Sequence, residues 1–433
     1  MPTVCQTLYL DAARLGPMSP QAQRMLHDFS RLTAEAPASL YVEDFLRHGF
    51  AALPEDDRQR LVALSAWPGL AGWKDSLRRF VGASADADVL VAGRSRSLMR
   101  LTARCLFQRC RNVLTTDLSW PAYQELLEGE ARRTGQGVTQ VAVRERLCSQ
   151  QISLDQLAVE LAQAARRFRS DGLFLPAVDN FGIRVPVAEI SEAIRQQSQL
   201  HFVATDAAQA IGHVPLLSDV EASDLVIAGT HKWLGGYLPL GLAFLCNEQT
   251  RKEIVETSER MRANEDLDDP LLDFLTDMEF GSLRTHTETV NLTPLLTCCG
   301  ALQDFTCPNG RVEVSLRQQL TNAEAIRTLA EVNGWKPMLS VTDQRTGIVL
   351  LQCVRPSIQS LSAEALRRRM QQVGFAATAY EGGIIRLSMP RTVLEPESLQ
   401  RIGSTLQQLS ADHNHRTVIN GYIPADHTAI AAC

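Results

Sequence analysis

The sequence contains few lysines and no hydrophobic run long enough to cross a membrane. Four of its 43 basic residues are lysines, and the formal net charge is -6 at pH 7. No run of about 18 apolar residues occurs, and the opening MPTVCQTLYLDAARLG has neither the basic nor the apolar region of a signal peptide. These features argue against a membrane or a nucleic acid as partner. We therefore expect a cytoplasmic globular protein.

The ten cysteines are scattered along the chain. No CxxC pair and no Cys/His cluster with the spacing of a zinc site occurs among them. We therefore expect reduced thiols and no bound metal. At 433 residues the chain can bury a large core and form two or three domains.

Polar residues stand where two predicted strands end in the stretch from His201 to Leu245. Apolar runs typical of buried strands lie in this stretch at residues 202–204, 225–228 and 242–245. Asp206 closes the first run, and Lys232 follows the second. In an open α/β sheet, ligands bind at this end of the strands. A scarce lysine at such a position indicates a need for a primary amine.

The segments 206–209 and 230–233 of this stretch resemble the fold-type I pyridoxal-phosphate (PLP) enzymes. The resemblance is to the class V aminotransferase family, which includes cysteine desulfurases, kynureninase and isopenicillin N epimerase. It implies that Lys232 forms the Schiff base with PLP and that Asp206 pairs with the pyridine nitrogen. It also implies that Thr230 and His231 contact the phosphate and that Gln209 lies near the cofactor O3′.

Each of these residue types suits the chemistry that the resemblance assigns to it. A lysine beside a cationic cofactor in a partly desolvated site can act as a neutral nucleophile. A carboxylate at the ring nitrogen keeps that nitrogen protonated, so the ring can accept electrons from a carbanion.

Three further loops carry cofactor contacts by the same resemblance. The turn after the predicted strand 88–92 places Arg94 and Ser95 where the family binds phosphate, and such a turn presents backbone N–H groups to an anion. Trp120, which precedes a proline, is expected to stack on the pyridine ring. Asp179 and Asn180 stand where the family has an asparagine near O3′, and which residue makes that contact stays open.

The resemblance also implies a shared active site and a substrate carboxylate. Thr289, in the segment Arg284–Asn291, matches a threonine that reaches the phosphate of the partner subunit, so we expect a homodimer. Arg386 matches the arginine that binds the substrate carboxylate as a bidentate fork. Arg14, in the opening segment, is expected to contact the substrate.

Alternating strand and helix patterns from about residue 88 to 245 predict βαβ units and a mostly parallel, doubly wound sheet. From about residue 310 the pattern changes to a smaller α+β arrangement. We expect the α/β fold of fold-type I PLP enzymes. Its predicted parts are an N-terminal segment at 1–55, a large PLP-binding domain at 56–305, a small domain at 306–410 and a tail at 411–433. The acidic stretch Asp266–Asp269 is expected to be a solvated loop.

The predicted chemistry is a reaction at Cα and Cβ of a small amino acid, with Lys232 as the Schiff-base lysine. A persulfide-forming desulfurase is disfavoured because the stretch Gly374–Glu381 lacks the mobile cysteine of those enzymes. A lyase that eliminates a β-substituent or cleaves a C–S bond is favoured. An aminotransferase and a decarboxylating or oxidative enzyme stay open. A catalytically inactive scaffold with the same fold is the non-enzymatic alternative, and no nucleotide-binding glycine motif supports a different class.

Overall fold

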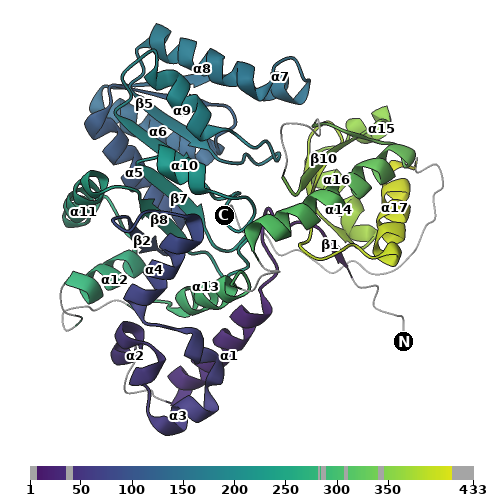
Figure 1. Ribbon diagram of the computed structural model, residues 1–433. Helices are drawn as coiled ribbons and strands as arrows, with labels where there is room; N and C mark the ends of the chain where they lie inside the picture. The colour runs from purple at the N-terminus through teal and green to yellow at the C-terminus, as the bar shows by residue number, and fades with distance from the viewer. Residues whose placement is uncertain are drawn as a thin grey trace, which may run out of the picture.

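The computed structural model describes residues 7–35, 42–280, 283, 289–306, 311–339 and 346–411. Two bodies are visible in Figure 1: a large one built on a seven-stranded sheet and a smaller one built on a four-stranded sheet. The α/β fold class predicted from the sequence is confirmed.

The large sheet is parallel except for one strand. Its order is β2-β8-β7-β6-β5-β3-β4, and β8 runs antiparallel to both neighbours. Its strands are β2 (Asp88–Ala92), β3 (Asn112–Thr116), β4 (Gly137–Val141), β5 (Gly172–Pro176), β6 (Phe202–Asp206), β7 (Leu225–Gly229) and β8 (Gly241–Leu245). β5 to β8 are buried at every position, which explains their continuous apolar sequences.

Helices cover both faces of this sheet, as a doubly wound fold requires. Alternate residues of β6 show the two faces: Phe202 packs in one apolar cluster with α5, α6 and α11, and Val203 packs in another with α8 and α9. The helices of this body after α4 are α5 (Ser95–Arg109), α6 (Pro121–Thr134), α7 (Arg144–Cys148), α8 (Leu154–Phe168), α9 (Val187–Arg195), α10 (Leu217–Ala222), α11 (Glu248–Ala263), α12 (Pro270–Phe280) and α13 (Thr293–Gln303).

An N-terminal group of helices packs below the sheet in Figure 1. Its elements are α1 (Pro20–Glu35), α2 (Glu43–His48), η1 (Phe50–Ala52), α3 (Glu55–Arg60), η2 (Val62–Ala66) and α4 (Leu70–Val81). The buried rings of Trp67 and Trp73 lie 5.6 Å apart in its core. α1 packs lengthwise on α13, so this group is continuous with the large body.

The small body is an antiparallel sheet, ordered β12-β13-β10-β9, with helices packed on it. Its elements are α14 (Val312–Val332), β9 (Trp335–Pro337), β10 (Ile348–Cys353), α15 (Pro356–Gln359), α16 (Ala363–Gln372), β11 (Phe375–Ala376), β12 (Thr378–Tyr380), β13 (Ile384–Ser388) and α17 (Pro396–Ser410). The two-residue strand β1 (Leu8–Tyr9) pairs in parallel with β11, so the N-terminal end of the described chain is part of this body.

The expectation of a solvated loop at Asp266–Asp269 is wrong for Asp269. This carboxylate is buried, and its Oδ1 accepts hydrogen bonds from the Gly93 N–H at 2.9 Å and from the Leu272 N–H at 3.1 Å. It therefore joins the turn after β2 to the start of α12.

None of the helices in the described ranges combines the length and apolar character needed to cross a bilayer. The seven cysteines in these ranges are free. The predicted tail lies almost entirely outside the described residues.

Candidate functional site

Most of the predicted site residues gather along one edge of the large sheet. Parallel strands end at the same edge, so the loops that follow them converge there. The predicted residues lie on the loops after β2, β3, β5, β6 and β7, in that order: Arg94 and Ser95; Trp120; Asp179 and Asn180; Asp206 and Gln209; Thr230, His231 and Lys232. The fold thus brings together side chains that are up to 138 positions apart in the sequence, Arg94 and Lys232 being the ends of the range.

Lys232 is partly buried on the turn after β7. Burial lowers the pKa of its amine to about 8, the nearby Asp206 carboxylate opposes this effect, and the Arg386 guanidinium adds to it. Lys232 is therefore within electrostatic reach of both an anion and a cation. Its amine is neutral in a substantial fraction of molecules near neutral pH, which a nucleophile or base requires.

Asp206 is buried at the end of β6, and its Oδ1 accepts a hydrogen bond of 2.8 Å from the Ala208 N–H. Burial raises the pKa of this carboxyl, against the opposing effects of that N–H and of Lys232. A carboxylate in this state is stabilised by any further cation or proton donor that enters the site.

Two polar atoms beside Lys232 lack a partner within the described chain. They are Oγ1 of Thr230 and Nδ1 of His231, both buried. Burial lowers the pKa of the His231 imidazole to about 4, so this ring is neutral near pH 7. Because buried polar atoms are nearly always hydrogen-bonded in folded proteins, these two point to a ligand with polar groups.

The turn between β2 and α5 packs closely against β8. Ser95 opens α5, where the first backbone N–H groups of a helix have no partner within the helix. A Cβ atom at Gly241 would lie 2.5 Å from the Ser95 nitrogen, so only glycine lets β8 approach this turn. The Ser95 hydroxyl accepts a hydrogen bond of 2.7 Å from Tyr123, a contact that the sequence did not reveal.

Asp179 and Asn180 occupy a tight turn after β5 but perform different tasks. The Asp179 Oδ1 accepts from the N–H groups of Phe181 and Ile183 at 2.9 and 2.8 Å, so this carboxylate holds its own turn. Burial raises its pKa to about 6. The Asn180 side chain instead reaches outward, where its Nδ2 donates to the Tyr380 hydroxyl at 3.3 Å.

Arg144 joins this turn although the sequence gave no sign of it. Its Nη2 donates to Asn180 Oδ1 at 3.3 Å, its Nε lies 3.7 Å from Asp179 Oδ2, and its guanidinium lies 4.8 Å from the centre of the Phe181 ring. Its charge is therefore compensated by a buried carboxylate.

Gln209 is engaged on both sides of its amide. Its Nε2 donates to the Ala13 carbonyl at 2.7 Å, and its Oε1 accepts from the Trp233 indole at 2.8 Å. The Trp233 ring stacks on His213 at 3.7 Å. His213 in turn accepts at Nε2 from the Gly347 N–H at 2.8 Å, which ties the lysine turn to the small body.

Arg386 lies on β13 with 4% of its surface exposed. Its Nη1 donates to the Asn180 carbonyl at 3.0 Å, and its Nη2 donates to Thr378 Oγ1 at 3.0 Å and to Asp11 Oδ1 at 3.2 Å. Its Nε is buried without a partner in the described ranges. Arg386 thus joins the small body to the turn after β5 and keeps one buried N–H unpaired in the described chain.

Four of the predicted residues lie at the surface. Arg14 and Arg94 are exposed, and Trp120 is 52% exposed just before α6. Trp120 is therefore not a core residue. Thr289 is exposed, but residues 284–288 of its segment lie outside the described ranges.

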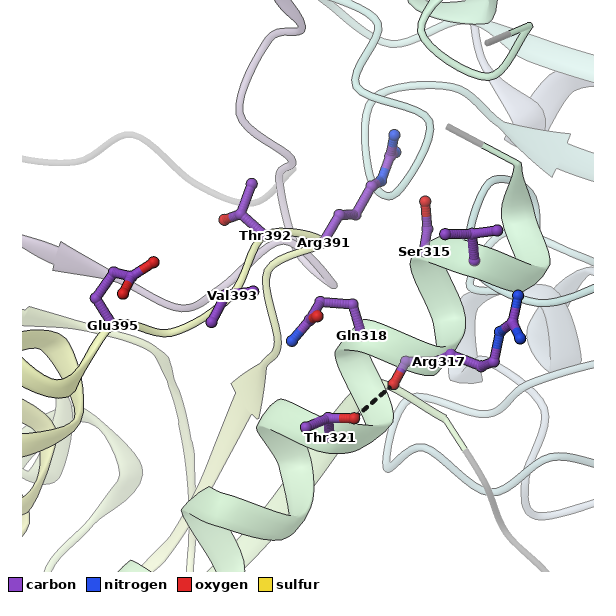
Figure 2. A pocket seen from close by; sticks show the side chains of 9 residues that line it. Ser315, Arg317, Gln318, Thr321, Arg391, Thr392, Val393 and Glu395 are labelled. Carbon is purple, nitrogen blue, oxygen red and sulfur yellow. Dashed lines mark hydrogen bonds between the residues drawn. The ribbon is translucent and has the colours of Figure 1, made fainter. Parts of the chain in front are cut away.

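A hollow of about 530 Å³ elsewhere on the molecule contains none of these residues. Figure 2 shows it between α14 and the chain after β13, with Arg317, Gln318 and Thr321 on the helix and Arg391 to Glu395 opposite. Within the described ranges no group of three or more His, Cys, Asp or Glu side chains is arranged to hold a metal ion.

Comparison with known proteins agrees with this arrangement. Residues 63–268 match the family model described as aminotransferase class-V. No curated protein matches the sequence. A NifS-like protein superposes with a TM-score of 0.64 at 13% identity, over 93% of this chain and 99% of that one. An alanine–glyoxylate aminotransferase from Nostoc sp. gives 0.62 at 17% identity, over 94% and 97%.

A third solved structure carries a cofactor. It is a C-DES mutant with glycine covalently linked to PLP, and it superposes with a TM-score of 0.64 at 15% identity, over 94% of this chain and 97% of that one. At such low identities the structural likeness establishes the fold.

Proposed function

We propose that the chain is a PLP-dependent enzyme of the class V aminotransferase family, whose model matches residues 63–268, and that it acts at Cα and Cβ of a small amino acid, with Lys232 as its Schiff-base lysine. The observation that carries this proposal is geometric: Asp206 ends β6, Lys232 follows the neighbouring strand β7, and Arg386 contacts the Asn180 carbonyl in the turn after β5 at the same edge of the sheet. An amine, a buried carboxylate and a carboxylate-binding guanidinium are what an amino-acid substrate and PLP require together.

The residues present fit PLP. Lys232 would hold the aldehyde carbon and Asp206 the protonated ring nitrogen, whose charge the buried carboxylate needs. The unpartnered Thr230 Oγ1 and His231 Nδ1, with the N–H groups at the start of α5, would hold the phosphate. When bound, PLP supplies an electron sink for the negative charge that develops at Cα. Gln209 fits less well as the O3′ contact, since both sides of its amide are already bonded.

The chain's own groups supply binding and proton transfer. Arg386 binds the substrate carboxylate and so fixes Cα relative to Lys232. The Lys232 Nζ, with its lowered pKa, accepts the proton from Cα as general base. Asp206 stabilises positive charge opposite its carboxylate throughout the reaction.

Lyase activity is the branch that the described residues support best. The short strands β11 and β12 cover Phe375–Tyr380 and contain no cysteine, so no nucleophilic thiol faces the site from this segment. Arg144, the further cation near Asn180, is compensated by Asp179. This argues against a second carboxylate-binding group of the kind that a dicarboxylate transaminase uses. Aminotransferase activity is the second candidate, favoured by the family model itself.

The absorbance spectrum with PLP tests the proposal. We expect wild-type protein to show the long-wavelength band of lysine-bound PLP, and we expect Lys232→Ala to lack it while keeping the far-UV circular dichroism of the wild type. Adding a panel of amino acids and cysteine S-conjugates should release pyruvate and ammonia if the protein is a lyase. Conversion of the cofactor to its amine form would instead indicate an aminotransferase. If the wild type binds no PLP, the proposal is wrong and the inactive scaffold is correct.

Further parts of the proposal concern the oligomeric state, the residues at the mouth of the site, the domain boundaries and the cellular compartment. Thr289 would reach the phosphate of a partner subunit, which predicts a homodimer in which a monomer holds PLP weakly. Arg14 would contact the substrate and Trp120 would stack on the pyridine ring of PLP, both from the mouth of the site. Sedimentation of the protein with and without PLP tests the assembly. We also keep the predicted domain boundaries at residues 55, 305 and 410 and the cytoplasmic setting as proposals.

A further inference from the structure

We infer that Asp11 is a positioning residue that orients Arg386 for the single α-carboxylate of an amino-acid substrate. This inference rests on the proposed function of Arg386. Asp11 and Arg386 lie 375 positions apart in the sequence, and 6% and 4% of their surfaces are exposed. The Asp11 Oδ1 accepts from Arg386 Nη2 at 3.2 Å and from Thr378 Oγ1 at 2.8 Å. Thr378 Oγ1 also accepts from Nη2 at 3.0 Å, which closes a three-membered ring of contacts.

These contacts involve Nη1 and Nη2 of the guanidinium but not Nε. Nη2 is held by Asp11 and Thr378, and Nη1 is held by the Asn180 carbonyl. The buried Nε has no partner in the described chain. Because a buried N–H is costly when left unpaired, Nε is the group that a substrate carboxylate would satisfy.

Asp11 also stabilises the Arg386 guanidinium when no substrate is bound. A buried guanidinium without a counter-ion is strongly destabilising, and long arginine side chains lose orientation when unpaired. Asp11 supplies the counter-charge and fixes the fork before substrate arrives, so less side-chain entropy is lost on binding.

The backbone around Asp11 fixes its position relative to Lys232. On one side, the Ser388 N–H donates to the Leu10 carbonyl at 2.8 Å, and the Ala13 N–H donates to Ser388 Oγ at 2.9 Å. Both contacts anchor the segment to β13, the strand of Arg386.

On the other side, the same segment is anchored to the lysine turn. The Ala13 carbonyl accepts from Gln209 at 2.7 Å, and the Gly16 N–H donates to the His231 carbonyl at 2.8 Å. A Cβ at Gly16 would overlap the Lys232 carbonyl, at 1.8 Å, so this contact admits only glycine. The segment Leu10–Gly16 therefore spaces the carboxylate-binding group from the amine-binding group.

The expected consequence is selection for a free α-carboxylate. The test compares glycine, which has no β-substituent to eliminate, with its methyl ester on the PLP-loaded protein, measuring the dissociation constant of each from the change in the PLP absorbance band. We expect the wild type to prefer the acid. In Asp11→Ala this preference should fall about tenfold, the value of one hydrogen bond to a charged group, with the PLP band unchanged before addition.

Conservative variants separate positioning from general loosening. Asp11→Asn keeps an Oδ1 that accepts from both donors but lacks the counter-charge, so the preference should lie between those of the wild type and Asp11→Ala. Thr378→Val removes one member of the ring with little change in volume and should lower the preference about threefold. Ser404→Ala, on the exposed surface of α17 in the same body, breaks only a hydrogen bond to the Gln400 carbonyl and should leave the preference as in wild type.

The outcomes are distinct. An unchanged acid preference in Asp11→Ala overturns the inference, as does a wild type that does not distinguish acid from ester. If Asp11→Ala does not fold, Thr378→Val decides: an unchanged preference in that variant overturns the inference. A wild type without a PLP band counts against the proposed function instead.

Discussion

The lowered pKa of Lys232 leads to a prediction about two single substitutions with opposite effects. Asp206 raises this pKa and Arg386 lowers it, while burial sets the overall direction. We therefore expect Asp206→Asn to move the titration of the Lys232 amine to lower pH and Arg386→Gln to move it to higher pH, both in protein freed of PLP.

The magnitude follows from the wild-type value. A pKa of about 8 in place of 10.5 corresponds to about 3 kcal/mol in favour of the neutral amine. At pH 7.5 about a quarter of Lys232 side chains are then neutral, against about 0.1% for a lysine with the ordinary value. This difference of more than a hundredfold is what makes Lys232 fit to capture an aldehyde.

The scarcity of lysine makes the measurement simple. Trace labelling with an amine-reactive reagent at a series of pH values, followed by peptide mass spectrometry, reports each of the four lysines separately. Lys252, whose side chain is 65% exposed, serves as the internal standard for the reagent. Labelling of Lys232 should rise with a midpoint near pH 8 in the wild type.

A wild-type midpoint above about pH 10, as for a solvated lysine, would refute the reasoning. So would movement of the midpoint in the same direction in both variants, because it would show that the two charges do not act on Lys232 as the geometry requires.

Three further predictions concern stability and cofactor binding. His213 is buried, and its pKa is lowered to about 3 from 6.5. Between these two pH values the unfolded chain binds a proton that the folded chain does not. The free energy of unfolding therefore falls as the pH falls through this range. In His213→Asn this slope should shrink by up to about 1.4 kcal/mol per pH unit in urea unfolding, and an unchanged slope contradicts the assignment. Gly241→Ala should weaken PLP binding and lower the free energy of unfolding by about 1–3 kcal/mol. Gly129→Ala, with open space around its Cβ, should leave PLP binding unchanged. Equal effects of the two substitutions on PLP binding would be evidence against the close approach of β8 to the turn before α5. Asp269→Ala should lower the unfolding free energy by about 1–2 kcal/mol and the exposed Asp268→Ala by far less, and similar values for both would show that the buried contacts are unimportant.

Much of the fold could be predicted because its strands are buried on both faces or bounded by clear turns. β2 has the predicted bounds, and the predicted apolar runs at 202–204, 225–228 and 242–245 lie within β6, β7 and β8. β4 was missed because Gly137–Val141 is a partly exposed edge strand without an apolar run or alternation. Patterns of burial are visible in a sequence only where burial is strong.

The site could be predicted only as separate pieces. Lys232 and Asp206 could be proposed because they lie at or just past the end of a buried strand and belong to a recognisable segment. The Asp11–Arg386 pair joins positions that no periodicity connects, and Asp269 was misread because acidic residues in a cluster usually face water. Arg144 lies on a short helix after the missed strand β4, so nothing local marked it.

The pairing of β1 with β11 has a consequence for the order in which the molecule is made. Leu8 pairs with Phe375, so the chain cannot close this contact during synthesis until nearly all of the small body has left the ribosome. Contacts of such high sequence separation form late, because they carry a large entropic cost of loop closure. The large sheet, whose strands end at residue 245, can form before then. Leu8 and Tyr9 therefore reach their final place after the large sheet can form, although they precede all of its strands in the sequence.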